Sequence, residues 1–306
     1  MVITILGKGA WGSALGSLVR RNNQPVSFWS RRDPISIGAA IANSTVLVSA
    51  VSMSGVSSVI EQLQQAAIAP TVIIVTATKG LDPQTTKTPS QIWQQAFPNN
   101  SIVVLSGPNL SPEIEQQLPA ATVLASHDLE AAKTVQTILA SASFRIYLNQ
   151  DPLGTELGGT LKNVMAIASG ICDGMGLGTN AKAALITRAL PEIIRVGVHL
   201  GAKKETFFGL SGLGDLIATC DSPLSRNYQL GYRLAQGQNL EEIIANLRGT
   251  AEGINTTKVL MTIAQQKNLS VPITQEINRL LNGEVSPQSA IENLMARELQ
   301  TESYQF

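Results

Sequence analysis

Three glycines near the N-terminus have the spacing of a dinucleotide-binding loop. Gly7, Gly9 and Gly12 form the pattern G-x-G-x-x-G, directly after the apolar, β-branched run at residues 2–6. In such a strand–turn–helix the first glycine allows the tight turn, the second lets a pyrophosphate approach the backbone, and the third lets the helix pack near the strand. The helix N-terminus offers N–H groups and a positive dipole end to the phosphates. This context predicts a dinucleotide site rather than a glycine-rich turn that binds nothing.

The end of the second predicted strand indicates which dinucleotide is bound. A ribose-binding Asp or Glu is expected about 20 residues after the glycine loop, but the stretch reads Phe28-Trp29-Ser30-Arg31-Arg32. Two guanidinium groups stand in place of the carboxylate, and they suit a 2′-phosphate. Arg31, assisted by Arg32, therefore predicts that NADP is preferred over NAD. Asp33 follows directly, and a small shift in register would bring its carboxylate to the same place.

A lysine lies within an apolar helical stretch of the second half. Lys162 belongs to Gly158-Gly159-Thr160-Leu161-Lys162-Asn163, where a charged side chain either extends to water or is held in a cleft. A lysine held in a cleft can exchange a proton near neutral pH, and the glycines would let a backbone or ligand approach. The residues alone leave a catalytic lysine and a snorkelling lysine equally open.

Three more charged residues lie at loops and helix starts. Lys79 is in the loop 76–80, past a predicted strand, where ligands of open α/β sheets bind; a solvated loop lysine is an equal alternative. Asp215 opens an apolar helix after a glycine turn, as its N-cap or as the partner of Lys162. Arg226 joins a guanidinium fork to the amides of a helix N-terminus, which suits phosphate, unless it is a surface arginine.

Strands and helices that would position these residues alternate through the first half. Continuous apolar runs such as 72–75 are typical of strands buried on both faces of a parallel sheet. Helical patterns at 10–21, 56–67 and 129–140 fill gaps between strands. The expected strands are 2–6, 26–29, 45–51, 71–77, 101–105, 121–125 and 144–148. This order predicts an α/β fold, a doubly wound Rossmann-type sheet over residues 1–149.

Strand patterns stop after about Asn149, and Asp151-Pro152 has the residue types of a helix start. Helices are expected at 154–172, 181–200, 225–235, 240–245, 253–266, 273–281 and 287–298. The first two are apolar on all sides, which is typical of buried helices. Residues 150–306 are therefore predicted to form an all-α domain for substrate and catalysis.

Composition excludes several classes of function. The 306 residues include 22 Lys and Arg against 22 Asp and Glu, which argues against a surface that coats nucleic acid or anchors to membranes. No apolar run reaches a membrane span, and Met1 leads straight into a core strand. Cys172 and Cys220 without CxxC spacing suit the reducing cytoplasm. With only His127 and His199, neither a metal site nor a Ser-His-Asp hydrolase is expected.

Seven motifs together resemble NAD(P)-dependent glycerol-3-phosphate dehydrogenase of the bacterial type, in family order across nearly the whole chain. They are GKGAWGSAL at 7–15, ATKGL at 77–81, SGP at 106–108, LGGTLKNVMAIASGICDGMGLGTNAKAALITRAL at 157–190, GLSGLGDLIATC at 209–220, SRN at 225–227 and AEG at 251–253.

The resemblance implies that a nicotinamide hydride reduces dihydroxyacetone phosphate to sn-glycerol 3-phosphate, which supplies glycerophospholipid synthesis. It implies that Lys162 donates the proton and Asp215 positions it. Lys79 would help to hold the developing oxyanion and the phosphate end, and Arg226 with the amides near Asn227 would clamp the phosphate. The implied substrate-binding residues are Lys79, Gly107, Lys162, Asp215, Thr219, Ser225, Arg226 and Asn227. The implied cofactor-binding residues are Gly7, Gly9, Ala10, Trp11, Gly12, Arg31, Arg32, Lys79, Ser111, Arg226 and Glu252. The resemblance is compatible with a homodimer.

The chain departs from the family pattern in two places. Only a short connection separates Trp29 from Thr45, whereas the family usually has a longer one with a loop near the cofactor. Asn109 and Ser111 stand where the family usually has Ser or Thr and Ala. Two alternatives remain: a 3-hydroxy-acid dehydrogenase, which would not need Arg226, and a non-catalytic nucleotide-binding descendant.

Overall fold

The computed structural model describes residues 1–247 and 249–298, which divide into two compact units. The first unit consists of residues 1–82 and 87–156. The second consists of residues 83–86 and the chain from 157 onward.

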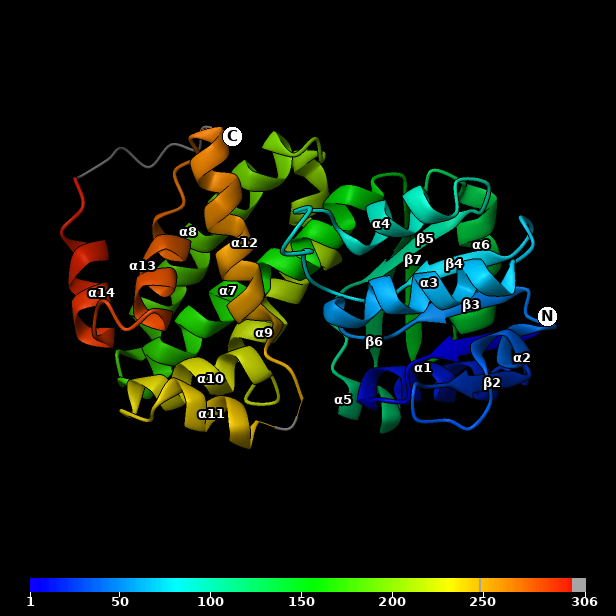
Figure 1. Cartoon of the computed structure of the whole chain (residues 1–306). Coiled ribbons are helices and arrows are strands. Elements are labelled where there is room, and N and C mark those ends of the chain that lie inside the picture. Colours follow the sequence, from blue (N-terminus) through cyan, green and yellow to red (C-terminus); the bar gives the residue numbers. More distant parts are fainter. Residues whose placement is uncertain (248, 299–306) are drawn as a thin grey trace. The chain divides into compact units, whose positions relative to one another are not determined.

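A seven-stranded sheet forms the centre of the first unit (Figure 1). Its strands are β1 (Ile3–Leu6), β2 (Val26–Trp29), β3 (Val46–Ser49), β4 (Ile73–Thr76), β5 (Ile102–Ser106), β6 (Ala120–Ala125) and β7 (Phe144–Asn149). All seven correspond to strands predicted from the sequence. The order is β2-β1-β3-β4-β5-β6-β7, so the chain reverses direction across the sheet at β1. The first five strands are parallel, and the loops after β1, β3, β4 and β5 therefore share one edge.

Helices cover both faces of this sheet, which confirms the doubly wound fold. One face packs on α1 (Ala10–Arg21), α5 (Ser111–Glu115) and α6 (Leu129–Leu139). The other packs on α2 (Ile37–Ile41), α3 (Val56–Ala66) and α4 (Pro89–Ala96). Strands buried on both faces explain the continuous apolar runs of the sequence.

The orientation of β6 differs from the parallel sheet expected from the sequence. β6 pairs antiparallel with β5 and parallel with β7. Parallel neighbours are usually joined by a crossover that contains a full helix. The connection 107–119 holds only the five-residue α5, so the chain turns back along the same edge.

The second unit is helical, as predicted (Figure 1). Its helices are α7 (Pro152–Gly174), whose first residues 152–156 belong to the first unit, α8 (Gly178–His199), α9 (Asp215–Asp221), α10 (Arg226–Ala235), α11 (Leu240–Asn246), α12 (Glu252–Lys267), α13 (Pro272–Leu281) and α14 (Pro287–Met295). Asp151 accepts a hydrogen bond from the Gly154 N–H at 3.0 Å, which confirms it as the capping residue of α7.

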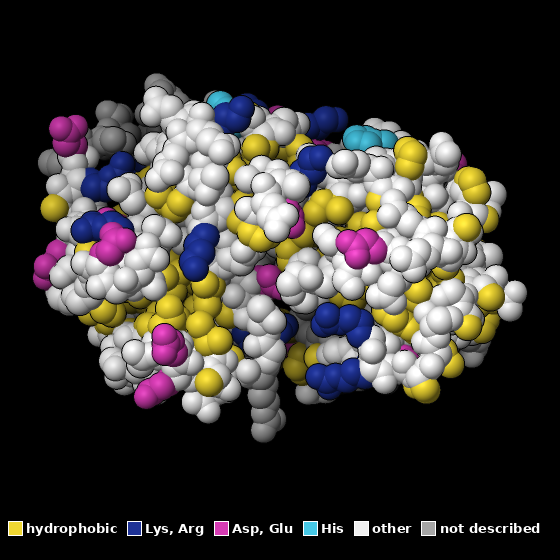
Figure 2. Space-filling model, in the orientation of Figure 1, with side chains coloured by type: hydrophobic (Ala, Val, Ile, Leu, Met, Phe, Trp, Pro, Cys, Tyr) yellow, Lys and Arg dark blue, Asp and Glu magenta, His cyan; other side chains and the backbone are white. Residues whose placement is uncertain are grey.

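On the face shown in Figure 2, charged side chains are dispersed. In Figure 2 the basic and acidic side chains lie singly or in small groups among uncharged ones, in keeping with their equal numbers. None of the helices in the described ranges combines the length and the apolar character that a membrane span requires.

Candidate active site

The glycine loop connects β1 to α1 at the carboxyl edge of the sheet. Gly7 has a φ of +114°, and a Cβ there would lie 2.7 Å from the Ala50 carbonyl oxygen after β3. Gly7 N–H donates to the Trp29 carbonyl at 2.8 Å, which fastens the loop to the end of β2. A Cβ at Gly9 would meet no atom within 4 Å, and Gly9 caps α1 without a side-chain bond. An open backbone surface at a helix N-terminus fits the pyrophosphate of a dinucleotide.

Two hydrogen bonds join the loops at this edge. The Trp11 indole N–H donates to the Ala77 carbonyl at 3.1 Å, which ties the start of α1 to the loop after β4. Lys79 Nζ donates to the Gly107 carbonyl at 3.3 Å, which ties that loop to the one after β5. The structure thus places the predicted site residues Trp11, Lys79 and Gly107 at one edge of the sheet. Gly12, a fourth predicted residue, follows Trp11 in α1.

The turn after β2 holds the residues expected to select the cofactor. Arg31 and Arg32 are exposed. Asp33 turns back, so that its Oδ2 accepts from the Ser30 N–H at 2.7 Å and its Oδ1 lies 2.7 Å from Lys8 Nζ. Asp33, which the sequence offered as an alternative ribose-binding carboxylate, is therefore adjacent to the glycine loop. Its two oxygens are already bound by Ser30 and Lys8.

Lys162 is buried in the second unit and paired with an acid. Its Nζ lies 2.5 Å from Asp215 Oδ1 and also donates to Thr219 Oγ1, which in turn donates to Asp215 at 3.3 Å. All three side chains are buried. The structure therefore rules out a solvated lysine. It also rules out Asp215 as an N-cap, because α9 is capped by Gly214 and Asp215 is its first residue.

Helix geometry explains how this cluster forms. Gly158 and Lys162 lie four residues apart, and so on one face of α7. A Cβ at Gly158 would lie 2.5 Å from the Ser211 carbonyl oxygen, so glycine permits the close approach of the segment leading into α9. Ser211 and Asp215 are also four residues apart, so the contact at Gly158 brings Asp215 toward Lys162. A π-helical turn, Leu210–Gly214, precedes α9, and such turns are frequent at functional sites.

Residues 225–227 form the start of α10. The Ser225 hydroxyl is the N-cap and accepts from the Tyr228 N–H at 3.3 Å. Asn227 is buried, and its side-chain oxygen accepts from the Gly253 N–H at 2.9 Å, so that it joins the starts of α10 and α12. Arg226 is exposed, and its guanidinium packs beside Gly249. The guanidinium therefore lies at the N-terminus of a ten-residue helix, where an anion is favoured.

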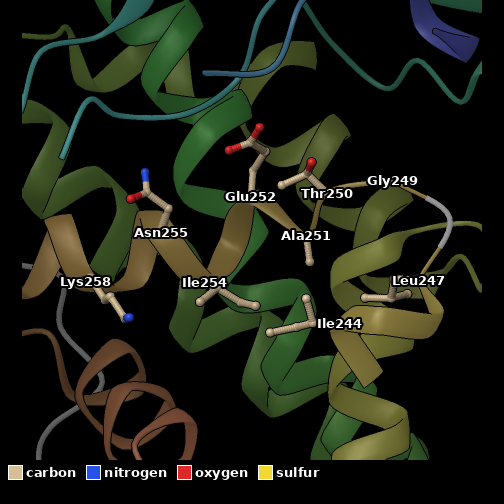
Figure 3. Close-up of a pocket in the computed structure, with 9 residues that line it drawn as sticks. All are labelled: Ile244, Leu247, Gly249, Thr250, Ala251, Glu252, Ile254, Asn255 and Lys258. Carbon is tan, nitrogen blue, oxygen red and sulfur yellow. The ribbon is translucent and has the colours of Figure 1, made fainter. Parts of the chain in front are cut away.

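A pocket of about 350 Å³ lies beside this start, between α11 and the first turns of α12. Figure 3 shows Ile244, Ala251 and Ile254 turned toward one another, whereas the Glu252 carboxylate points away from them. Glu252, predicted to bind the cofactor, is thus on the rim of the pocket.

Ser111, also predicted to bind the cofactor, lies in the first unit, where it is the first residue of α5.

Sequence reasoning missed a buried carboxylate on α7. Glu156 accepts from the Ser90 N–H at 3.0 Å and from Ser90 Oγ at 2.5 Å, at the start of α4. Burial raises the pKa of Glu156 to about 7, against the opposing effect of these hydrogen bonds. No local pattern could have revealed the pair, because the two residues are 66 positions apart.

Candidate metal ligands are dispersed in the part of the chain that the structure describes. Within residues 1–247 and 249–298, no three His, Cys, Asp or Glu side chains come together as metal ligands. That the chain has no metal site stays a prediction from the sequence.

Comparison with known proteins gives consistent matches over both units. The family model described as NAD-dependent glycerol-3-phosphate dehydrogenase N-terminus matches residues 2–37 and 34–132, and that of the C-terminus matches 151–292. The N-terminal match divides at the short connection after β2. Glycerol-3-phosphate dehydrogenase (NAD(P)+) of Acaryochloris marina is 60% identical over 301 residues, which cover 98% of this chain and 97% of that protein.

The same enzyme of Synechocystis is also 60% identical, over 304 residues that cover 99% of this chain and 96% of that protein. Among solved structures, glycerol-3-phosphate dehydrogenase of Coxiella burnetii has a TM-score of 0.92 at 32% identity, and the match covers 97% of this chain and 99% of that one.

Proposed function

Because the chain belongs to the NAD-dependent glycerol-3-phosphate dehydrogenase family, we propose that it reduces dihydroxyacetone phosphate to sn-glycerol 3-phosphate with NADPH or NADH. The product supplies glycerophospholipid synthesis. Residues 1–149 bind the cofactor, and residues 150–306 bind the substrate.

The observation that carries the proposal is the buried pair of Lys162 and Asp215. The bound nicotinamide supplies the hydride, and reduction of a ketone also needs one proton on the carbonyl oxygen. Lys162 delivers that proton, because its ammonium is held in place inside the protein rather than in water. Asp215 and Thr219 fix the position of Nζ, because both accept a hydrogen bond from it.

The glycine loop and the turn after β2 hold the cofactor. Main-chain amides at the start of α1 receive the pyrophosphate, and the exposed guanidinium groups of Arg31 and Arg32 receive a 2′-phosphate, so NADP is preferred. The residues assigned to the cofactor are Gly7, Gly9, Ala10, Trp11, Gly12, Arg31, Arg32, Lys79, Ser111, Arg226 and Glu252.

The start of α10 holds the phosphate of the substrate. Arg226 supplies a bidentate guanidinium, and the helix N-terminus supplies amides and a positive dipole end. The Ser225 and Asn227 side chains act as supports, because their oxygens accept from backbone N–H groups of α10 and α12. Lys79, beside the Gly107 carbonyl, serves the oxyanion and the phosphate end.

We assign the chain to the cytoplasm, because Cys172 and Cys220 are both unpaired and buried, as suits a reducing compartment.

One assay tests the proposed reaction. Purified protein should oxidise NADPH on addition of dihydroxyacetone phosphate and should reduce NADP on addition of sn-glycerol 3-phosphate. Dihydroxyacetone serves as the matched control, since it has the same carbonyl without the phosphate, and it should be a poor substrate. Turnover of 3-oxo acids without turnover of the phosphate ester would instead support a 3-hydroxy-acid dehydrogenase.

A further inference from the structure

An ion pair connects the glycine loop to the turn after β2. Lys8 stands between the first two glycines of the loop, and its Nζ lies 2.7 Å from Asp33 Oδ1. The other oxygen of Asp33 accepts from the Ser30 N–H at 2.7 Å, and the Asp33 N–H donates to the Ser30 carbonyl at 3.0 Å. Both oxygens of the carboxylate therefore have a donor.

Asp33 lies just after β2, where dinucleotide-binding sheets commonly carry a ribose-binding carboxylate. In dinucleotide-binding sheets a carboxylate near the end of the second strand accepts from the ribose 2′-hydroxyl and repels a 2′-phosphate. Asp33 is the one carboxylate in the segment 30–36. Its side chain is 15% exposed, whereas that of Lys8 is 46% exposed. The hydrogen bond from Lys8 holds the pKa of Asp33 below its usual value, so the acid stays ionised.

The backbone makes the pair part of a fixed frame. Gly7 N–H donates to the Trp29 carbonyl, so the residue before Lys8 is bonded to the last residue of β2. Lys8 and Asp33 therefore face each other across a short, hydrogen-bonded junction. Lys8 contacts the Asp33 carboxylate, and the exposed Arg31 and Arg32 precede Asp33 directly in the sequence.

We propose that the Lys8–Asp33 ion pair determines the balance between NADPH and NADH. Lys8 neutralises and turns aside the carboxylate that would otherwise repel the 2′-phosphate, which leaves Arg31 and Arg32 to attract it. The inference rests on the proposed function, since it concerns the cofactor of that reaction. Lys8 is a specificity-determining residue that acts through Asp33.

A double-mutant cycle on cofactor binding tests the inference. Dissociation constants for NADPH and NADH are measured by calorimetry, without substrate, on the parent, Lys8→Met, Asp33→Asn and the double variant. In Lys8→Met the ratio of the two constants should shift toward NADH by about tenfold or more, as expected for an uncompensated unit charge near a surface. The shift should shrink with added salt. Lys133→Met, which breaks a surface pair on α6, is the matched control and should leave the ratio unchanged.

The Asp33→Asn background separates an indirect role of Lys8 from a direct one. If Lys8 acts through Asp33, adding Lys8→Met to Asp33→Asn should not change the ratio further. If Lys8→Met shifts the preference toward NADH equally in the parent and in Asp33→Asn, Lys8 contacts the cofactor directly. That result would overturn the inference. If the parent binds both cofactors and Lys8→Met leaves the ratio of their dissociation constants unchanged, the inference is overturned but the proposed function is not. Failure of the parent to bind either cofactor would overturn the proposed function as well.

Discussion

Replacement of Lys162 by Met tests the proposed proton donor most directly. Met retains an unbranched apolar stem but has neither the ammonium nor its proton. Loss of a positioned general acid lowers the rate by about 10²–10⁴-fold. In Lys162→Met, kcat for dihydroxyacetone phosphate should fall by this factor, measured as initial rates of NADPH oxidation. The Kd for NADPH, measured by calorimetry, should change little, because the glycine loop belongs to the other unit.

The same variant should also unfold more easily. If Lys162 were unpaired in its apolar helix, its replacement would raise stability, because a desolvated charge would be removed. The structure pairs Lys162 with buried Asp215 at 2.5 Å. Removing one partner of a buried pair leaves an uncompensated charge and costs about 3–5 kcal/mol. At about 2–4 °C for each kcal/mol, Tm should fall by about 6–20 °C.

A second substitution separates stability from catalysis. Lys162→Met combined with Asp215→Asn removes both charges and should recover much of the lost Tm, while kcat stays low. Lys133→Met is the control, since its exposed pair with Glu130 contributes at most about 1 kcal/mol. A kcat near that of the parent in either Lys162 variant would refute the mechanism. A Tm unchanged in the single variant would refute the argument from the buried pair.

Three further outcomes are expected. Arg226→Ala should raise KM for dihydroxyacetone phosphate by about tenfold to a hundredfold, the effect of one lost charge-assisted hydrogen bond; equal losses with dihydroxyacetone would make Arg226 structural instead. Arg31→Ala should weaken NADPH binding more than NADH binding in calorimetry, and unchanged affinity for NADPH would contradict its role. Glu156 has a pKa raised from 4.5 to about 7 in the folded protein, so it favours folding below pH 4.5 and this contribution is lost as the pH rises through 7. Urea unfolding should show the parent losing up to about 3 kcal/mol relative to Glu156→Gln across that interval, whereas parallel pH profiles would contradict the assignment.

Much of the fold follows from local sequence patterns. The helix at 10–21 and the strand at 26–29 begin and end where the sequence predicts, because apolar periodicity and capping residues act over a few positions. Boundaries shift where residues beyond the element are themselves apolar: the strand predicted at 45–51 is Val46–Ser49, and Ala50 and Val51 follow it. The change to helices after Asn149 is likewise predicted by Asp151 and Pro152, which are residue types typical of a helix start.

Sequence determined the chemical inventory of the protein as well. It supplied the glycine loop, two arginines after the second strand, Lys162 in an apolar helix and Arg226 at a helix start. Motif order also identified the family, which the comparisons confirmed. The roles assigned to individual residues stay predictions until the variants above are measured.

Tertiary structure alone decided which side chains meet. Lys162 and Asp215 are 53 positions apart, Lys8 and Asp33 are 25 apart, and Glu156 and Ser90 are 66 apart. Whether such groups are paired or solvated depends on how helices and loops pack, as at Gly158, where the α9 segment can approach. The antiparallel β6 was decided in the same way, because the connection before it holds only the five-residue α5 in place of a full crossover helix. Hydrophobic periodicity records which face of an element is buried, but it carries no information about the distant residue that lies against that face.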